Sequence, residues 1–364
     1  MRIGGCAPGA WKAATVLMLL AGTFLTGCGT YLRHGLDPAQ ARQREQTLTR
    51  REIGLSREQA EKILALNPED ISGRDVRELL ATAPAPRIIT LHAGVFFAIS
   101  PSISFCKFLK GMGYPAASLK NPGDGTYTFS CYESSRKIAG VIAWYYEKEG
   151  LRPMMIGHSQ GGMQTVKVLH RLAGNSDLRV WNPLTWKPED RCEIMDPLSG
   201  RTQPVAGLVL PYAAVLGAGG LTRTLPNQWS MCFPSMGLHQ IPDSVESFTG
   251  FCKGADLWGG DYLGFGSMNH YKAEERAVVR NVWLPTAYTH IFTPDTKHLL
   301  KSQEIKDWID NYRPAGERIV RLKLDEQFEA DARNILWAAD VWYSIKKHWV
   351  IELQRWIRAK PGPK

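Results

Sequence analysis

A serine between glycines is the residue of this chain best placed for covalent chemistry. Residues 157–161 read Gly-His-Ser-Gln-Gly, and residues 153–156 before them read Pro-Met-Met-Ile. The apolar run predicts a buried strand, and the apolar spacing of residues 160–172 predicts a helix after it. In a strand–turn–helix setting the serine hydroxyl projects from a strained turn, and the helix directs its first amides at the same place. We therefore interpret Ser159 as a nucleophile and the amide of Gln160 as an oxyanion donor.

This glycine-rich turn resembles that of a known superfamily. The run at residues 157–162, Gly-His-Ser-Gln-Gly-Gly, is similar to that of lipases and esterases of the α/β-hydrolase superfamily, over roughly residues 87–312. In that superfamily a second oxyanion amide comes from the loop after an earlier strand that ends in His-Gly. Residues 91–95 read Leu-His-Ala-Gly-Val, one residue longer than usual. The resemblance implies that the amide of Val95 is the second donor and that His92 shapes this loop.

A serine hydroxyl attacks well only when a histidine takes its proton and a carboxylate orients that histidine. In the resembled superfamily the acid and then the histidine follow the serine along the chain. Residues 247–251 are strand-like and lead through Lys-Gly-Ala to Asp256, our preferred acid. Asp261 and Asp243 stay open as alternatives, because aspartate is common in turns.

Two histidines follow the last strand-like run, residues 278–284. His290 lies nearer the end of that run and is the preferred base. His298 is the alternative, because it precedes the apolar pattern of a closing helix. His158, next to the nucleophile, is expected to support the turn by packing or by a hydrogen bond.

Strand-like and helix-like stretches alternate from residue 86 to residue 313, which predicts a parallel sheet with helices on both faces. The fold class expected is therefore α/β, of the α/β-hydrolase type. Segments 180–204 and 217–247 are irregular and are interpreted as insertions over the active-site end of the sheet. Strands are expected at residues 87–91, 113–119, 153–156, 205–212, 247–251 and 278–284, and helices around 138–150, 160–172 and 305–309.

Residues 314–364 are expected to form a helical extension. Within it, apolar side chains recur every seven residues from Phe328 through Ile335, Trp342 and Trp349 to Trp356. A seven-residue repeat drifts only about 20° per step on a helix, so these residues form one stripe. We expect the stripe to pack on the catalytic domain. A dimer seam and a membrane-surface helix are alternatives, the latter because of basic residues such as Lys346 near the end of the chain.

The first residues resemble an export signal. Arg2 and Lys12 flank the apolar run 13–25, which is followed by Leu-Thr-Gly-Cys at residues 25–28. This pattern resembles a bacterial lipobox, so residues 1–27 are expected to be removed and Cys28 to carry a lipid. An ordinary secretory signal is the alternative. Gly29, instead of aspartate, favours an outer-membrane lipoprotein that faces the periplasm. Residues 28–85 are expected to form a tether and N-terminal helices.

Charge and cysteine content narrow the possible partners. The formal charge is +9, and loss of Arg2 and Lys12 with the signal leaves +7. For an exported chain this favours an anionic membrane surface over nucleic acid, although a solvated basic surface would look the same. Five cysteines remain after Cys28, none in a Cys-x-x-Cys pair, which argues against a zinc or dithiol centre and leaves up to two disulfides open. They are Cys106, Cys131, Cys192, Cys232 and Cys252.

The resemblance implies a serine hydrolase of carboxylic esters that needs neither cofactor nor metal. The membrane location suggests lipid-like acyl esters as substrates. Two other functions stay open at this point. One is acyl transfer to an acceptor other than water through the same triad, and the other is a non-catalytic lipoprotein that uses the fold as a binding scaffold.

Overall fold

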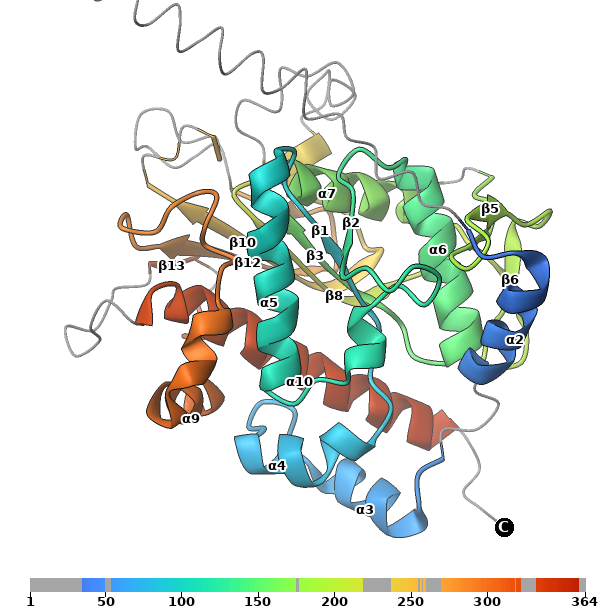
Figure 1. Ribbon diagram of the computed structural model, residues 1–364, viewed down its shortest axis with the longest axis horizontal. Coiled ribbons are helices and arrows are strands. Elements are labelled where there is room, and N and C mark those ends of the chain that lie inside the picture. The colour runs from blue at the N-terminus through green and yellow to red at the C-terminus, as the bar shows by residue number, and fades with distance from the viewer. Residues whose placement is uncertain are drawn as a thin grey trace, which may run out of the picture.

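A computed structural model describes most of the chain (Figure 1). It covers residues 35–49, 54–174, 177–218, 237–254, 256, 258–259, 270–317, 319–321 and 332–359. The expectations for the signal segment, Cys28, Asp261, Cys232 and Phe328 concern residues outside these ranges, as does the insertion between residues 219 and 236.

A seven-stranded sheet forms the centre of the molecule, and all of its strand pairs are parallel. The order across the sheet is β13-β12-β10-β8-β3-β1-β2. The α/β fold class predicted from the sequence is thus confirmed. The strands are β1 (Ile88–Leu91), β2 (Thr128–Phe129), β3 (Met154–His158), β8 (Leu210–Leu216), β10 (Val245–Lys253), β12 (Val278–Leu284) and β13 (Ile319–Arg321).

Helices cover both faces of the sheet, which explains why β1, β3 and β8 are nearly continuous apolar runs. In β3, Met154 and Ile156 join one core while Met155 joins the other, as the two-residue period of a strand requires. The first core includes α5 (Ile99–Gly111) and α10 (Ile335–Ala359). The second includes α6 (Ser135–Glu149) and α7 (Gln160–Ala173).

The strand order reverses direction beside β1. The chain places β2 on one side of β1, and every later strand of the sheet from β3 onward is added on the other side. Leu91 at the end of β1 is paired with Gly157 near the end of β3. The loops that leave these two strands therefore lie together at the carboxyl edge, at the switch point where parallel α/β sheets bind ligands.

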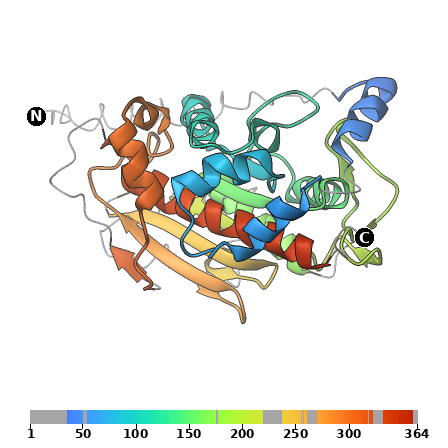
Figure 2. The ribbon, with the colours of Figure 1, turned by 90° about the horizontal axis from the view of Figure 1, so that it is seen from below.

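The C-terminal helix α10 is part of the core. Figures 1 and 2 show it crossing the molecule along one face of the sheet. Trp342 and Trp349 of the predicted stripe are fully buried, and Trp356 is partly buried. The prediction that the stripe packs on the catalytic domain holds. The dimer seam and the membrane-surface helix are wrong for these residues, because the tryptophans are already covered within the same chain.

The N-terminal helices are docked to the rest of the chain. Capping boxes at Ser56 and Ser72 start α3 (Arg57–Ala65) and α4 (Gly73–Glu78). Both helices contribute to the core around α10, and the Gln354 side chain of α10 donates to the carbonyl of Ile63 (3.0 Å). The helix α2 (Pro38–Leu48), within the expected tether, reaches α6 through a Lys148–Glu45 ion pair (2.8 Å).

Two expected strands differ from the structure, and two strands of the sheet were not expected. Residues 113–119 contain a 3₁₀ helix, η3 (Ala116–Leu119), whose carbonyls include an acceptor for the buried side chain of Arg87. The expected strand at 205–212 begins only at Leu210, because Gly207 has a φ of 99° and interrupts the extended run. The edge strands β2 and β13 were missed, since each is too short to leave an apolar pattern.

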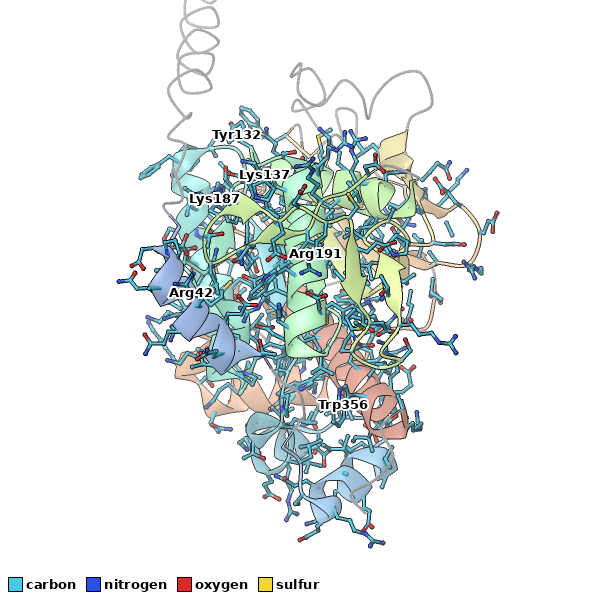
Figure 3. All side chains as sticks on the ribbon, turned by 90° about the vertical axis from the view of Figure 1, so that its right-hand side faces the viewer. Arg42, Tyr132, Lys137, Lys187, Arg191 and Trp356 are labelled. Atoms are coloured by element: carbon cyan, nitrogen blue, oxygen red, sulfur yellow. The ribbon has the colours of Figure 1, made fainter. Side chains whose placement is uncertain are left out.

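The insertion at 180–204 packs against α6, and its first hairpin also reaches the carboxyl edge of the sheet, where the Trp186 and Phe129 rings are 6.2 Å apart between centroids. It forms two hairpins, β4–β5 and β6–β7, and Figure 3 shows Arg191 lying against α6. Arg191 Nη1 donates to Glu147 Oε1 (2.7 Å), close to the last turn of α6. That turn precedes β3, so these contacts are at the opposite edge of the sheet from Ser159. The hairpin strands are β4 (Trp181–Asn182), β5 (Lys187–Pro188), β6 (Glu193–Met195) and β7 (Thr202–Pro204).

The remaining elements are short and lie around the sheet. None of the helices in the described ranges is long and apolar enough to cross a membrane. The remaining short elements are η1 (Leu80–Thr82), η2 (Phe96–Ala98), η6 (Gly237–His239), β9 (Gln240–Ile241), β11 (Lys272–Ala273), η8 (Lys297–Lys301) and α9 (Gln303–Asn311).

Candidate active site

Ser159 occupies a strained turn between β3 and α7. Its φ of 53° and ψ of −120° are unfavourable for a residue with a side chain. The turn is held from both sides, because Ser159 N donates to Leu216 O (2.7 Å) and Gly162 N donates to Ser159 O (2.8 Å). A Cβ at Gly161 would lie 2.4 Å from Leu91 O, so only glycine lets α7 start this close to β1. Such strain persists where the surrounding structure fixes it, and it marks functional turns.

The structure brings Ser159, His290 and Asp256 together. His290 Nε2 lies 2.8 Å from Ser159 Oγ, and His290 Nδ1 lies 2.8 Å from Asp256 Oδ2. Asp256 follows β10 and His290 follows β12, and these two strands are paired up to Lys253 and Leu284. The parallel register therefore delivers both loops to the edge of the sheet where β3 ends. This arrangement has the geometry of a nucleophile, its base and an orienting acid.

The Asp256 carboxylate is kept ionised. Burial raises its pKa, but the hydrogen bond and charge of His290 and a bond from Gly259 N (2.9 Å) outweigh this, so the pKa is below its ordinary value. An ionised Asp256 accepts a hydrogen bond from His290 Nδ1–H, so the neutral ring carries its proton on Nδ1 and presents an unprotonated Nε2 to the serine hydroxyl. The tautomer that can remove the serine proton is thereby favoured.

His158 connects the Ser159 turn to the loop that carries His290. Its Nε2 lies 2.7 Å from His290 O, and the two rings are 5.3 Å apart between centroids. Burial and the nearby His290 lower the pKa of His158 to about 3, so the ring is neutral at working pH. A neutral ring that meets a carbonyl must carry its proton on Nε2 and donate it. The expected supporting role thus takes the form of a hydrogen bond that positions His290.

The loop after β1 is oriented by Tyr132, a residue that no sequence pattern predicted. Tyr132 Oη donates to Gly94 O (2.7 Å). Because a trans peptide holds its carbonyl and N–H in opposite directions, this bond turns the amide of Val95 away from Tyr132. The amide of Gln160 is the first in α7 and has no acceptor within the helix. His92 Nδ1 lies 2.7 Å from Ala93 O, within the same loop.

One alternative acid, Asp243, and the alternative base, His298, lie away from Ser159 and make other contacts. His298 Nε2 lies 3.0 Å from Arg333 O and does not contact the triad. Asp243 accepts from the backbone amide (2.7 Å) and Nε (2.9 Å) of Arg276. Asp261 is outside the described residues.

No second nucleophile or metal cluster is apparent in the described part of the chain. Cys106 and Cys131 are buried free thiols, and Cys192 is a partly buried one. Burial raises the pKa of Cys106 to about 12, so it carries no reactive thiolate at neutral pH. Within the described ranges, no three histidine, cysteine, aspartate or glutamate side chains are grouped as metal ligands would be.

Comparisons with known proteins leave the site to be judged on its own geometry. No protein-family model matches the chain, and a search of curated proteins gave no match.

Proposed function

We propose that this protein is a serine hydrolase of the α/β-hydrolase type that cleaves carboxylic esters. One observation supports this more than any other: the unbroken chain of hydrogen-bond distances from Ser159 Oγ through His290 to Asp256. The strained turn and the position of the site at the switch point of a parallel sheet agree with the same proposal. A binding scaffold would need neither the strain nor the chain of contacts.

The proposed reaction proceeds through an acyl-enzyme. His290 Nε2 removes the proton of Ser159 as Oγ attacks the ester carbonyl. The amides of Gln160 and Val95 stabilise the negative charge that develops on the carbonyl oxygen. His290 then gives its proton to the departing alcohol. In the second half a water loses its proton to His290, attacks the acyl group and releases the acid.

We propose lipid-like acyl esters as the substrate class and the outer membrane as the location. The lipobox-like segment that ends at Cys28 supports both proposals. Metabolic labelling with a palmitate analogue tests the anchor, because wild-type protein should incorporate it and Cys28→Ser should not. Labelling of both proteins, or of neither, would contradict the lipoprotein assignment.

Covalent labelling by a fluorophosphonate tests the catalytic proposal directly. The folded wild-type protein should be labelled, and Ser159→Ala should not. Absence of labelling in folded wild type, or equal labelling of both, would overturn the proposal. Hydrolysis of p-nitrophenyl esters of increasing chain length then tests the substrate class, because a preference for long acyl chains is expected and a preference for acetate would contradict it.

A further inference from the structure

The exposed phenylalanines of the described surface all adjoin the loops of the candidate site. Phe96 is 73% exposed and Phe97 is 51% exposed, and both lie in η2 directly after the Val95 loop. Phe292 is 49% exposed and follows His290 closely in sequence. Scattered exposed apolar residues are ordinary, but aromatic rings on neighbouring loops mark an interaction surface.

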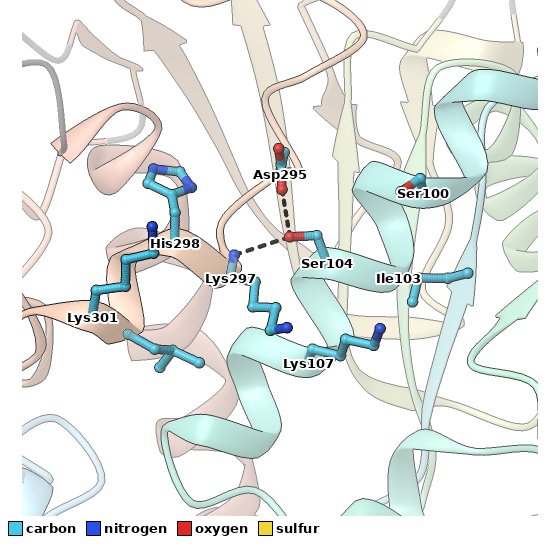
Figure 4. Close-up of a pocket in the computed structure, with 9 residues that line it drawn as sticks. Ser100, Ile103, Ser104, Lys107, Asp295, Lys297, His298 and Lys301 are labelled. Carbon is cyan, nitrogen blue, oxygen red and sulfur yellow. Dashed lines mark hydrogen bonds between the residues drawn. The ribbon is translucent and has the colours of Figure 1, made fainter.

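A groove runs between α5 and η8 (Figure 4). Two of its lining residues, Ser100 and Asp295, each follow an exposed phenylalanine by three residues in the chain. Its volume is about 490 Å³. Ser104 on α5 links the two walls, because its Oγ donates to Asp295 Oδ1 (2.5 Å) and accepts from Lys297 N (3.0 Å). The same stretch holds Phe292, since the Asn334 side chain donates to the carbonyls of both Phe292 (2.8 Å) and Asp295 (3.1 Å). Neither Ser159 nor His290 lines the groove.

The groove is cationic, because three lysines and a single carboxylate line it. Lys107, Lys297 and Lys301 line it and are exposed, and no ion pair with a carboxylate is found for them among the described residues. Figure 4 shows the ammonium groups of Lys107 and Lys297 projecting into the groove from its two walls. The one carboxylate of the lining, Asp295, is hydrogen-bonded to Ser104. An anionic partner is therefore the complementary one.

The separation of the aromatic and basic residues limits how the chain can lie on a lipid surface. Phe97 and Lys107 are ten residues apart on η2 and α5, which corresponds to about 15 Å along a helix. The headgroup layer of a bilayer is roughly 5–8 Å thick, and lysine side chains reach several ångströms along an apolar surface to place their charge in it. With α5 inclined to the bilayer normal, phenylalanines at the hydrocarbon boundary would leave the lysine side chains within reach of the lipid phosphates.

We propose that Phe96, Phe97, Phe292, Lys107, Lys297 and Lys301 form a membrane-docking face for an anionic phospholipid bilayer. The phenylalanines enter the edge of the hydrocarbon layer and the lysines bind the phosphates. This docking does not depend on catalysis by Ser159, because none of the six side chains belongs to the triad. Where the proposed esterase activity also holds, the face turns the Ser159 loop toward lipid.

Vesicle co-sedimentation of the chain from residue 28 onward, the expected mature form, tests the face. Every variant also carries Cys28→Ser, so that neither the apolar run 13–25 nor an acyl anchor contributes. We expect preferential binding to vesicles that contain about 30% phosphatidylglycerol over pure phosphatidylcholine, because basic residues are attracted to anionic lipid. Combined alanine substitution of Lys107, Lys297 and Lys301 should weaken binding to the anionic vesicles on the order of 100-fold at low salt. The matched control replaces Lys62, Lys187 and Lys272, which are exposed lysines elsewhere, and should lose far less.

The phenylalanines are tested at about 1 M salt, where screening removes most of the charge attraction. Phe96→Ser with Phe292→Ser should weaken the residual binding by about 10-fold or more. Thermal melting checks the fold of each variant, and should the triple lysine variant melt early, the three single variants replace it, with about a fivefold loss each. Equal loss in the site and control triples, no preference for anionic vesicles, or unchanged binding of the phenylalanine variant would overturn the proposal. Wild-type vesicle binding by the site triple would point instead to an acidic protein as the partner of the groove.

Discussion

Two buried clusters of charged side chains lie at opposite ends of β3. They differ in whether the buried carboxylate is connected through hydrogen bonds to a serine hydroxyl. Before the strand, the Glu352 carboxylate of α10 accepts from Arg152 N (2.9 Å), Nε (3.0 Å) and Nη2 (2.6 Å). After the strand, the Asp256 carboxylate accepts from Gly259 N and from His290. In the first cluster the donors are the N–H groups of Arg152, which keep their protons. In the second cluster His290 connects the carboxylate to the hydroxyl of Ser159, which in the proposed reaction loses its proton and attacks the ester carbonyl.

The backbone differs in the same sense. Ser159 is held at a φ of 53°, whereas Glu352 lies within a regular helix. Burial of charge is thus common to both clusters and identifies neither as a catalytic site. What distinguishes the candidate site is a proton path that ends on a strained, nucleophilic residue, and this is the feature expected of catalysis. The comparison predicts that changes in the first cluster reduce stability and that changes in the second reduce activity.

The largest effect is expected for the base. His290→Ala should lower kcat for ester hydrolysis by about 10⁶-fold, because the serine then has no proton acceptor. His298→Ala is the matched control and should keep most of the activity, since His298 contacts Arg333 O and not the triad. Steady-state kinetics with a p-nitrophenyl ester measures both. Equal losses in the two variants would show that the geometry around Ser159 does not govern the reaction.

The next effect concerns the acid. Asp256→Asn should lower kcat by about 10⁴-fold while leaving the melting temperature nearly unchanged, because the amide favours the wrong tautomer of His290. Asp243→Asn offers the same chemical change at a residue that accepts from Arg276 and should leave kcat unchanged. A loss of activity in Asp243→Asn that matched the Asp256 variant would contradict the assigned acid.

A smaller effect, on stability, is expected in the cluster formed by Arg152 and Glu352. Glu352→Gln should lower the free energy of unfolding by about 3 kcal/mol, since Arg152 keeps its charge in a buried site without a full counter-charge. Glu246→Gln removes the other carboxylate that pairs with Arg152. The Glu246 side chain is 45% exposed, so this change should lower the free energy of unfolding by less than about 1 kcal/mol. Urea denaturation measures both, and per-molecule ester hydrolysis of the folded Glu352 variant should stay close to wild type. A loss of activity without a loss of stability would reverse the comparison.

The sequence predicted the strands that carry the triad because their signals are local. The runs at β1 and β3 are mostly apolar, those at β10 and β12 are rich in β-branched and aromatic residues, and the turn at Ser159 is recognisable from its glycines. The choice of Asp256 over Asp243 is not local, because it depends on which loop the register of β10 and β12 brings to His290. Tyr132 could not be found for the same reason, since it reaches Gly94 from a loop after a short edge strand.

The prediction for α10 was correct for one face only. The seven-residue stripe indicated a packed face, but nothing in a single helix reveals that α3 and α4 cover more of it. Lys346, read from sequence as part of a basic surface, is buried and donates to Ile71 O (2.7 Å) and Asp310 O (2.8 Å). Such a charge is satisfied by carbonyls that only the tertiary fold supplies.

The smallest predicted effect concerns the buried Lys346. This residue should change how the free energy of unfolding depends on pH, whereas the triad variants should change activity. Burial lowers the pKa of Lys346 to about 8, although Asp310 acts in the opposite direction. The unfolded chain holds this proton up to about pH 10.4, so between the two values the unfolded state binds more protons and the free energy of unfolding rises with pH. From pH 7 to pH 9, wild type should therefore gain about 1 kcal/mol relative to Lys346→Met. Urea denaturation at both pH values measures the difference. A constant difference would mean that the folded Lys346 keeps an ordinary pKa and that its burial costs little.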